Sequence, residues 1–537
     1  MARPPVRVDD PPAGVAVDWD VPVVVRDGTR LRVNVFRPAG GGRVPVLMSA
    51  HPYGKDHLPG RRRFGPRVPV QYRMLRQPRP FAFSAWTGWE APDPAFWVPR
   101  GYAVVNCDLR GCGSSDGAGT LLSDQEAGDY FDLIEWAAAQ SWSTGRVGLN
   151  GVSYLAISQY KVAALGPPSL AAICPWEGFT DAYRDLMWPG GIREDGFAVM
   201  WARSLRGQRL TTDLRAEQLA RPLRDEWWRS LVPALERIRV PMLVCGSFSD
   251  HNLHSQGSFR AFERASSEQK WLFTHRAGKW ATYYSPEALD MQLRFFEHFL
   301  KDADSGITER APVDLAVHDV RETPLEVRGE QEWPLARTAW RELHLRAGGR
   351  LTEAGSAGEG TVRFRSPDGE ARFTWTLDEP LELTGPMSLR LSVELQGADD
   401  CNLFVAVEKR RSGRRVPFEG SYGFGLDPLT TGWLKLSHRA LDQGPSRPFA
   451  PVHTHTEPRP LSAGEVATAE IALLPSATAF RPGDQLELVV RAAWPWPHNP
   501  LTGQYPAAYE RSPECRVVLH VGRTEASARL LVPGIPR

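Results

Sequence analysis

The stretch from Gly145 to Tyr160, GRVGLNGVSYLAISQY, constrains the fold more than any other part of the chain. A short apolar strand ends at Asn150, a tight turn carries residues 151 to 154, and a run compatible with a helix follows. This is the strand, turn and helix order of a nucleophile elbow, in which a strained backbone projects a serine hydroxyl from the carboxyl edge of a sheet. We therefore predict that Ser153 is a nucleophile, with a helix N-cap as the alternative role.

Composition narrows the class of protein. The 537 residues are 42% hydrophobic and 24% charged, which is typical of a soluble globular chain with two or three domains. The net charge of +1 gives no reason to expect a nucleic acid partner. Six scattered cysteines without metal-like spacing indicate buried thiols in a reducing compartment. No segment is apolar enough for a signal or a membrane helix, so we expect a cytoplasmic protein without a membrane partner.

Strand and helix patterns alternate before the elbow. An apolar strand at 44–50 leads into the loop 51–56, and another at 102–107 leads into the glycine-rich loop 108–117. We expect Asp108 and Arg110 to brace that loop as an ion pair, with a phosphate cradle as the weaker alternative. An amphipathic helix at 124–139 follows. The succession predicts an α/β fold with a doubly wound sheet.

Two later strands provide partners for the serine. The strand 240–246 is followed by Asp250, and the strand 270–275 ends at His275. The order serine, aspartate, histidine is that of a hydrolase triad, so we predict Ser153, Asp250 and His275 as the catalytic residues. The competing histidines are His251 and His254, on the same loop as the acid, and His298, in an amphipathic helix.

Four pieces of sequence together resemble the CocE/NonD hydrolases. They are PYGKD at 52–56, DLRGCGSSDG at 108–117, WAAAQSW at 136–142 and GVSYL at 151–155. The chain departs from the family pattern in three places: Ala156 replaces the last glycine of the elbow, Phe248 replaces a tryptophan before the acid, and Arg276 replaces the glycine after the histidine. The resemblance implies an α/β-hydrolase fold with an inserted helical cap.

The resemblance also implies how the site is completed. The oxyanion hole would combine the Tyr53 hydroxyl, carried over from the family, with the backbone N–H of Tyr154. We expect the aromatic residues Trp176, Trp188 and Phe248 to line the substrate pocket, and Tyr183, Phe197 and Trp201 are further candidates. The alternative is that these residues form a packed core. Recognition of a substrate ammonium group would need acidic cap residues, for which the candidates are Glu177, Asp181, Asp185, Glu194 and Asp195.

From about residue 312 the pattern changes to short alternating strands separated by glycine and proline turns, which is typical of a β-sandwich. Segments such as FRPGD at 480–484 resemble the C-terminal jelly-roll domain of the same family. We predict a first part of the α/β-hydrolase domain at 1–166, a helical cap at 167–236, a second part of the hydrolase domain at 237–311 and an all-β jelly-roll domain at 312–537. The last domain is expected to give structural support, with carbohydrate binding as the alternative.

The sequence thus predicts a serine hydrolase that cleaves an ester or amide acyl bond in a small molecule, with no metal and no organic cofactor. Two alternatives stay open: an acyltransferase that uses the same triad to pass the acyl group to an amine or alcohol, and a noncatalytic binding protein on this scaffold. A homodimer formed through an exposed jelly-roll surface is an open alternative to a monomer.

Overall fold

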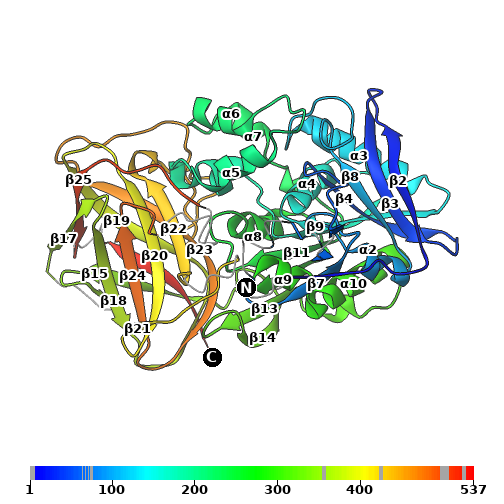
Figure 1. Ribbon diagram of the computed structural model, residues 1–537. Coiled ribbons are helices and arrows are strands. Elements are labelled where there is room, and N and C mark those ends of the chain that lie inside the picture. Colours follow the sequence, from blue (N-terminus) through cyan, green and yellow to red (C-terminus); the bar gives the residue numbers. More distant parts are fainter. Residues whose placement is uncertain are drawn as a thin grey trace.

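The computed structural model describes residues 6–62, 65–66, 68–69, 72, 77–353, 358–421, 427–495, 507–522 and 528–536. Two lobes lie side by side, with the β-sandwich at one end of the molecule and a mixed α/β lobe at the other (Figure 1). No described helix has both the length and the apolar character that crossing a bilayer requires.

A ten-stranded sheet forms the centre of the α/β lobe. Its strands, in spatial order, are β2 (Val15–Val24), β3 (Arg30–Pro38), β8 (Ala103–Asp108), β4 (Val44–His51), β9 (Ser143–Val152), β10 (Leu170–Trp176), β11 (Met242–Ser247), β12 (Lys270–His275), β13 (Val313–His318) and β14 (Pro324–Glu330). The strands from β8 to β13 run parallel, and both edges are antiparallel. The carboxyl ends of the parallel strands therefore meet at one edge, where such sheets place their ligand sites.

Helices cover both faces of this sheet. One layer contains α3 (Asp124–Ala138), α4 (Tyr154–Ala163) and α8 (Ser255–Arg264); the other contains α2 (Pro94–Trp97), η1 (Val98–Arg100) and α10 (Pro286–Lys301). Successive side chains of a strand point to opposite faces. In β4, Val46 and Met48 accordingly pack with α3 and α4, whereas Leu47 packs with α10. The buried strands are apolar throughout because both faces are covered.

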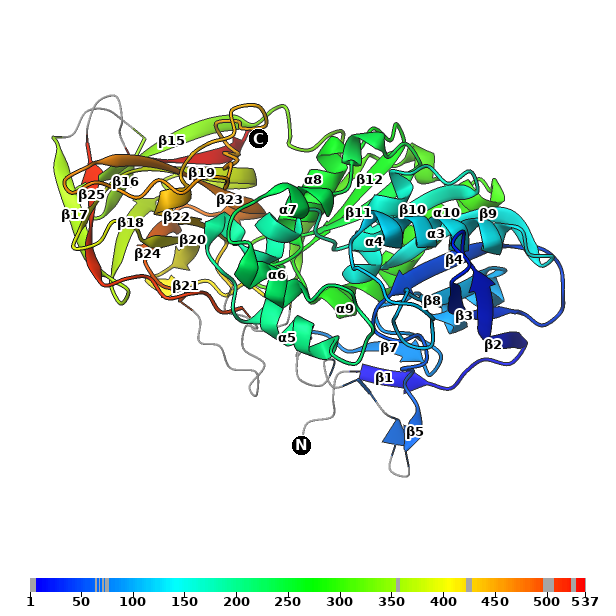
Figure 2. The ribbon, with the colours of Figure 1, turned by 90° about the horizontal axis from the view of Figure 1, so that it is seen from above.

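The cap is inserted between β10 and β11. It comprises η2 (Tyr183–Met187), η3 (Pro189–Gly191), α5 (Phe197–Ser204), α6 (Leu214–Ala220), α7 (Glu226–Ser230) and η4 (Leu235–Arg237). Figure 2 shows these helices at the centre of the molecule, between the sandwich and the sheet. Because β10 is a strand of the central sheet, the insertion starts after Trp176 and not at the expected residue 167.

The C-terminal lobe is the predicted jelly-roll sandwich. One sheet contains β15 (Ala339–Arg346), β26 (Arg529–Ile535), β19 (Leu381–Gln396), β23 (Ala467–Phe480), β25 (Cys515–Val521) and β17 (Gly360–Ser366). The facing sheet contains β16 (Arg350–Thr352), β18 (Glu370–Thr376), β24 (Gln485–Arg491), β20 (Asn402–Arg411), β22 (Thr430–Lys435) and β21 (Arg414–Arg415). Alternate residues of the two sheets form one apolar core, which includes Leu389, Phe373 and Leu488.

The central sheet extends past residue 311, where the sequence placed the boundary of the sandwich. The strands β13 and β14 continue this sheet, and β13 also touches β23 of the sandwich through His318 and Thr478. The remaining elements are the short pairs β1 (Val6–Asp9) with β7 (Phe81–Ser84) and β5 (Arg61–Arg62) with β6 (Gly65–Pro66), and the helices α9 (Lys279–Tyr283), η5 (Ile307–Glu309) and η6 (Leu436–His438). The predicted fold class is confirmed, with these shifts in its internal boundaries.

Candidate active site

Ser153 occupies the turn between β9 and α4, as predicted. Its backbone has φ 61° and ψ −118°, a conformation that is strained for a residue with a side chain. The turn needs glycine at 151, where φ is 151° and a Cβ atom would lie 2.5 Å from the Cβ of Leu155. The side chain of Ser153 makes no capping hydrogen bond to the helix. Its hydroxyl is therefore available to other partners, and the N-cap alternative is not supported.

The partner of the serine hydroxyl is His254. The Oγ atom of Ser153 lies 3.2 Å from Nε2 of His254, and Nδ1 of the same ring lies 2.5 Å from Oδ2 of Asp250. His254 and Asp250 are both buried, whereas Ser153 is partly exposed. The Ser153 hydroxyl, the His254 ring and the Asp250 carboxylate thus form one chain of contacts, which is the arrangement that a nucleophile, its base and an orienting group require.

A tight turn after β11 brings the acid and the histidine together. The carbonyl of Asp250 accepts hydrogen bonds from the N–H groups of Leu253, His254 and Ser255. This turn leads directly into α8 and places the His254 ring against the carboxylate four residues earlier. On its other side the ring stacks on Phe179, with 6.3 Å between centroids. The packing fixes the orientation of the imidazole.

The structure places His275, which the sequence predicts as the base, beside a carboxylate other than that of Asp250. His275 ends β12, as expected, but its Nε2 lies 3.0 Å from Oε1 of Glu177. Among the described residues no hydrogen bond joins His275 to Ser153 or to Asp250. The spacing of four residues is the one sequence signal for a contact between Asp250 and His254. It is weak because both residues lie on one loop.

Glu177, Cys245 and His275 lie close enough together to suggest a metal site. The backbone N–H of Ala277 donates to Nδ1 of His275 at 3.1 Å, so a neutral ring carries its proton on Nε2. That proton faces Glu177, and burial raises the pKa of the Cys245 thiol well above its ordinary value. A ring nitrogen that donates to a carboxylate does not ligate a metal, so we interpret the group as a hydrogen-bonded pair beside a neutral thiol.

Lys279, for which the sequence predicted no role, reaches the carboxylate of Asp250. Its Nζ lies 2.9 Å from Oδ2 of Asp250 and 3.0 Å from Nδ1 of His254. Burial, followed by the charge of Lys279, lowers the pKa of His254 below its usual 6.5. Burial alone would raise the pKa of Asp250, but Lys279 and His254 together hold it well below its ordinary value. The Asp250 carboxylate is thus ionised and the His254 ring is neutral near pH 7.

The two groups predicted for the oxyanion hole belong to Tyr154, which follows Ser153, and to Tyr53, which contacts Tyr154. Tyr154 is the first residue of α4, and N–H groups in the first turn of a helix have no acceptor within it. The ring of Tyr53 packs edge-on against that of Tyr154, with 6.2 Å between centroids. The Tyr53 oxygen accepts a hydrogen bond from Nε1 of Trp201 in the cap, which leaves its own hydrogen free to donate. Burial raises the pKa of Tyr53, so the hydroxyl stays protonated.

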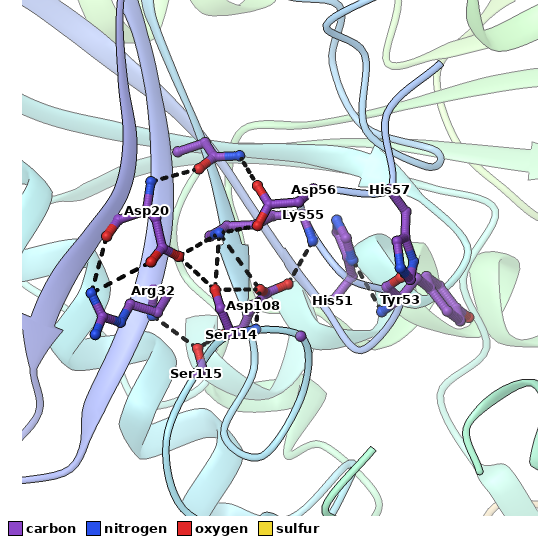
Figure 3. A network of polar contacts seen from close by, with 12 residues as sticks. Asp20, Arg32, His51, Tyr53, Lys55, Asp56, His57, Asp108, Ser114 and Ser115 are labelled. Carbon is purple, nitrogen blue, oxygen red and sulfur yellow. Dashed lines mark hydrogen bonds and ion pairs between the residues drawn. The ribbon is translucent and has the colours of Figure 1, made fainter. Parts of the chain in front are cut away.

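A buried lysine anchors the loop that carries Tyr53 (Figure 3). The Nζ atom of Lys55 lies 2.8 Å from Asp20, 2.7 Å from Asp56 and 3.0 Å from the hydroxyl of Ser114. These partners come from β2, from the loop itself and from the glycine-rich loop after β8. The lysine therefore ties three segments together two residues from the tyrosine.

Asp108 completes this anchor instead of pairing with Arg110. Its two carboxylate oxygens accept the backbone N–H of Lys55 at 2.6 Å and that of Ser114 at 3.0 Å. A Cβ atom on Gly113 would lie 2.1 Å from this carboxylate, so the loop requires glycine there. Arg110 binds Asp129 through two hydrogen bonds of 2.7 Å, which corrects the expected Asp108–Arg110 pair.

The three aromatic residues expected to line the pocket are packed in cores. Trp176 is fully buried under the sheet against Phe273. Trp188 is buried in the cap beside Tyr183, and Phe248 stacks on Phe259. All three side chains are buried among other side chains, which fits the alternative role as core residues. Of the further candidates, Trp201 reaches the Tyr53 hydroxyl, whereas Tyr183 packs beside Trp188 and Phe197 packs against the core.

A buried carboxylate caps the helix that carries Trp201. Glu194 accepts the N–H groups of Gly196 and Phe197 at 2.9 and 2.8 Å, and that of Ala198 at 2.6 Å. It thereby caps the first turn of α5, which carries Trp201. A further bond from the N–H of Ala508 ties this turn to the sandwich lobe. Glu194 thus joins helix α5 of the cap to the sandwich lobe.

Every acidic cap residue considered for ammonium recognition already has a protein partner. Glu177 binds His275, Asp181 binds Arg184 and Arg224, Asp185 binds Arg260, Glu194 caps α5, and Asp195 binds Arg193 and Arg215. Their charges are therefore already balanced or hydrogen-bonded within the protein. None of these five carboxylates is thus left unpaired to receive a substrate ammonium group.

Comparisons with known proteins agree with this fold. Residues 27–280 match the X-Pro dipeptidyl-peptidase (S15 family) model, and residues 305–506 match the model of the X-Pro dipeptidyl-peptidase C-terminal non-catalytic domain. The chain is similar to the cocaine esterase of a Rhodococcus species, with 26% identity over 97% of this chain and 99% of that protein. Both lobes are thus matched in one relative.

Solved structures extend the similarity. A CocE/NonD family hydrolase from Staphylococcus aureus superposes with a TM-score of 0.91 and 35% identity, covering 97% of this chain and 94% of that one. An α-amino acid ester hydrolase shares the fold, with a TM-score of 0.70 and 17% identity over 97% of each chain. The chain belongs to the CocE/NonD hydrolase family, and it is a serine hydrolase.

Proposed function

We propose that the protein hydrolyses an ester or amide bond of a small molecule through an acyl-enzyme on Ser153, with His254 as the base and Asp250 as the orienting acid. The observation that carries this proposal is the continuous path from the Ser153 hydroxyl, 3.2 Å to Nε2 of His254, and from Nδ1 of that ring, 2.5 Å to Asp250. The first distance lies at the long end of the range of about 2.6–3.2 Å expected for a nucleophile and its base, and the second is slightly shorter than that range.

The reaction follows from this geometry. Nε2 of His254 takes the proton of Ser153 as Oγ attacks the acyl carbonyl, and Asp250 stabilises the imidazolium that forms. The Tyr53 hydroxyl and the N–H of Tyr154 donate to the oxyanion of the tetrahedral intermediate. The intermediate collapses when the bond to the leaving alcohol or amine breaks, and His254 returns its proton to that group. Water then repeats the sequence on the acyl-enzyme and releases the acid.

The partners of the cap carboxylates indicate which acyl groups the site would accept. Because the acidic residues considered for an ammonium group already have partners, the site favours an acyl group without a free α-amine. We therefore place simple acyl esters ahead of aminoacyl esters and dipeptidyl substrates. Transfer to an amine or alcohol in place of water is the second candidate, since the acyl-enzyme would be the same.

Intact-mass detection of the acyl-enzyme tests the proposal. Wild type and Ser153→Ala are mixed with activated aryl esters and with aminoacyl amides. We expect an adduct with aryl esters on wild type and none on Ser153→Ala. Added alcohols that consume the adduct faster than water does would favour transfer. No adduct and no turnover with any probe would contradict the enzymatic assignment and favour a noncatalytic binding protein.

A further inference from the structure

A buried ammonium group contacts the acid and the base of the site at the same time. Lys279 begins α9, and its Nζ lies 2.9 Å from Oδ2 of Asp250 and 3.0 Å from Nδ1 of His254. Only 3% of its side chain is exposed. Its backbone N–H donates to the carbonyl of Ser421 at 3.1 Å, which fixes the start of the helix. The lysine is therefore held in place from the sandwich side of the site.

We propose that Lys279 is a positioning residue that holds the Asp250 carboxylate against His254 and keeps His254 in its neutral, proton-accepting form. The inference rests on the proposed function in one respect, namely that His254 is the base. It adds a fourth residue to the machinery, acting through the other three and not on the substrate.

The hydrogen bonds of Asp250 and His254 explain how the lysine acts. Oδ2 of Asp250 accepts from both Nδ1 of His254 and Nζ of Lys279. When Nδ1 carries the proton that it donates to Asp250, it has no lone pair left for the ammonium. The lysine then affects the ring through its charge, which opposes a second proton on Nε2. A cation within 4–6 Å typically shifts a neighbouring group in this direction by about one to three pH units.

Other charged groups around the site do not cancel this effect. Asp250 on its own loop and Glu177 after β10 favour the protonated form of His254, while Phe179 adds a neutral ring. Glu90 faces the lysine and accepts from Nε1 of Trp280 at 2.7 Å. Burial raises the pKa of Glu90 to about 7, against the opposing charge of Lys279. With all of these groups in place, the pKa of His254 is still lowered.

The rate of labelling by a fluorophosphonate, followed as a function of pH, tests the inference because it reports activation of the serine without a known substrate. We expect Lys279→Met to move the acid limb of the labelling rate upward by about one pH unit or more, because the base then protonates more easily. Lys279→Arg should keep the wild-type limb. Lys301→Met is the control for loss of a helix lysine that contacts neither Asp250 nor His254: Lys301 lies in α10 and binds Glu297 at 2.7 Å.

The outcomes separate the two proposals. Three results would each overturn the role of the charge. The acid limb of the labelling rate could stay in place in folded Lys279→Met, the rate could fall equally at every pH, or Lys279→Arg could show the same shift as Lys279→Met. If Lys279→Met melts below the assay temperature, Lys279→Gln must show the same upward shift. If His254→Ala is labelled as fast as wild type, the base assignment itself fails. If His254→Ala is inert while the limb of Lys279→Met is unchanged, only the inference about Lys279 fails.

Discussion

Nδ1 of His254 lies 2.5 Å from Oδ2 of Asp250, a carboxylate only four residues earlier on the same loop. Acid and base therefore come from one turn between β11 and α8, and a single set of backbone hydrogen bonds to the Asp250 carbonyl orients both. The end of β12, where the sequence placed the base, is instead occupied by the His275–Glu177 pair. Lys279 follows His275 by four residues, and its Nζ lies 2.9 Å from Oδ2 of Asp250.

The pH dependence of the wild-type enzyme should reflect the environment of His254. Burial and Lys279 lower its pKa, and the ring accepts the serine proton only when it is neutral. Activity is therefore lost as pH falls through a value below the ordinary 6.5 or so. We expect the acid limb of kcat/KM for an aryl ester to have its midpoint below about 6.5. A midpoint at pH 7 or above would show that the site does not depress this pKa.

Tyr53→Phe should lower kcat by roughly a hundred- to a thousandfold, because it removes one oxyanion donor. The ring contact with Tyr154 is kept, so the melting temperature should stay close to that of wild type. Trp201→Phe is the companion variant: it removes the bond that orients the Tyr53 hydroxyl but leaves the donor in place, and a smaller loss is expected. Unchanged turnover in Tyr53→Phe would remove this residue from the oxyanion hole.

Lys55→Met should destabilise the fold and weaken catalysis indirectly. The change leaves the buried Asp108 without its nearby cation and frees the loop that carries Tyr53. Loss of such a buried partner costs about 1–3 kcal/mol, which corresponds to a lower melting temperature by several degrees. Asp56→Asn, at a partner that is 54% exposed, serves as the comparison and should have a smaller effect. Equal melting temperatures for Lys55→Met and wild type would argue against the anchor.

Gly113→Ala tests the same anchor without changing a charge. A Cβ atom there would lie 2.1 Å from Oδ2 of Asp108, and the backbone φ of 52° disfavours a side chain. The carboxylate would have to move and release the N–H groups of Lys55 and Ser114. We expect reduced thermal stability and reduced kcat together. Gly145→Ala is the control for the backbone conformation alone, since φ is 91° and no atom lies within 4 Å of its Cβ.

The sequence could predict the fold because its signals are local. The alternation of apolar strands and helices, the elbow around Ser153 and the change of pattern near residue 312 are all visible in short windows. The boundaries were less accurate for a physical reason. The alternating strands β13 and β14 form an edge hairpin of the central sheet, and such strands cannot be distinguished locally from those of a sandwich.

The site was predicted less completely because it depends on long-range geometry. Ser153 and Asp250 follow strands and could be placed at one edge of the sheet from their order alone. The choice between His254 and His275 depends on a turn whose hydrogen bonds do not appear in the sequence. The aromatic residues also depend on long-range packing. Trp176 and Phe248 are apolar whether they line a pocket or fill a core, and only their packing in the folded protein distinguishes the two roles.

The most direct test of the central claim compares His254→Ala with His275→Ala at saturating and limiting concentrations of an aryl ester. The account predicts that His254→Ala loses roughly ten-thousandfold or more in kcat/KM, as expected when a base is removed from its nucleophile. His275→Ala should be labelled by a fluorophosphonate and should retain most of its turnover, since its ring binds Glu177. The reverse result, an inert His275→Ala and an active His254→Ala, would contradict the account.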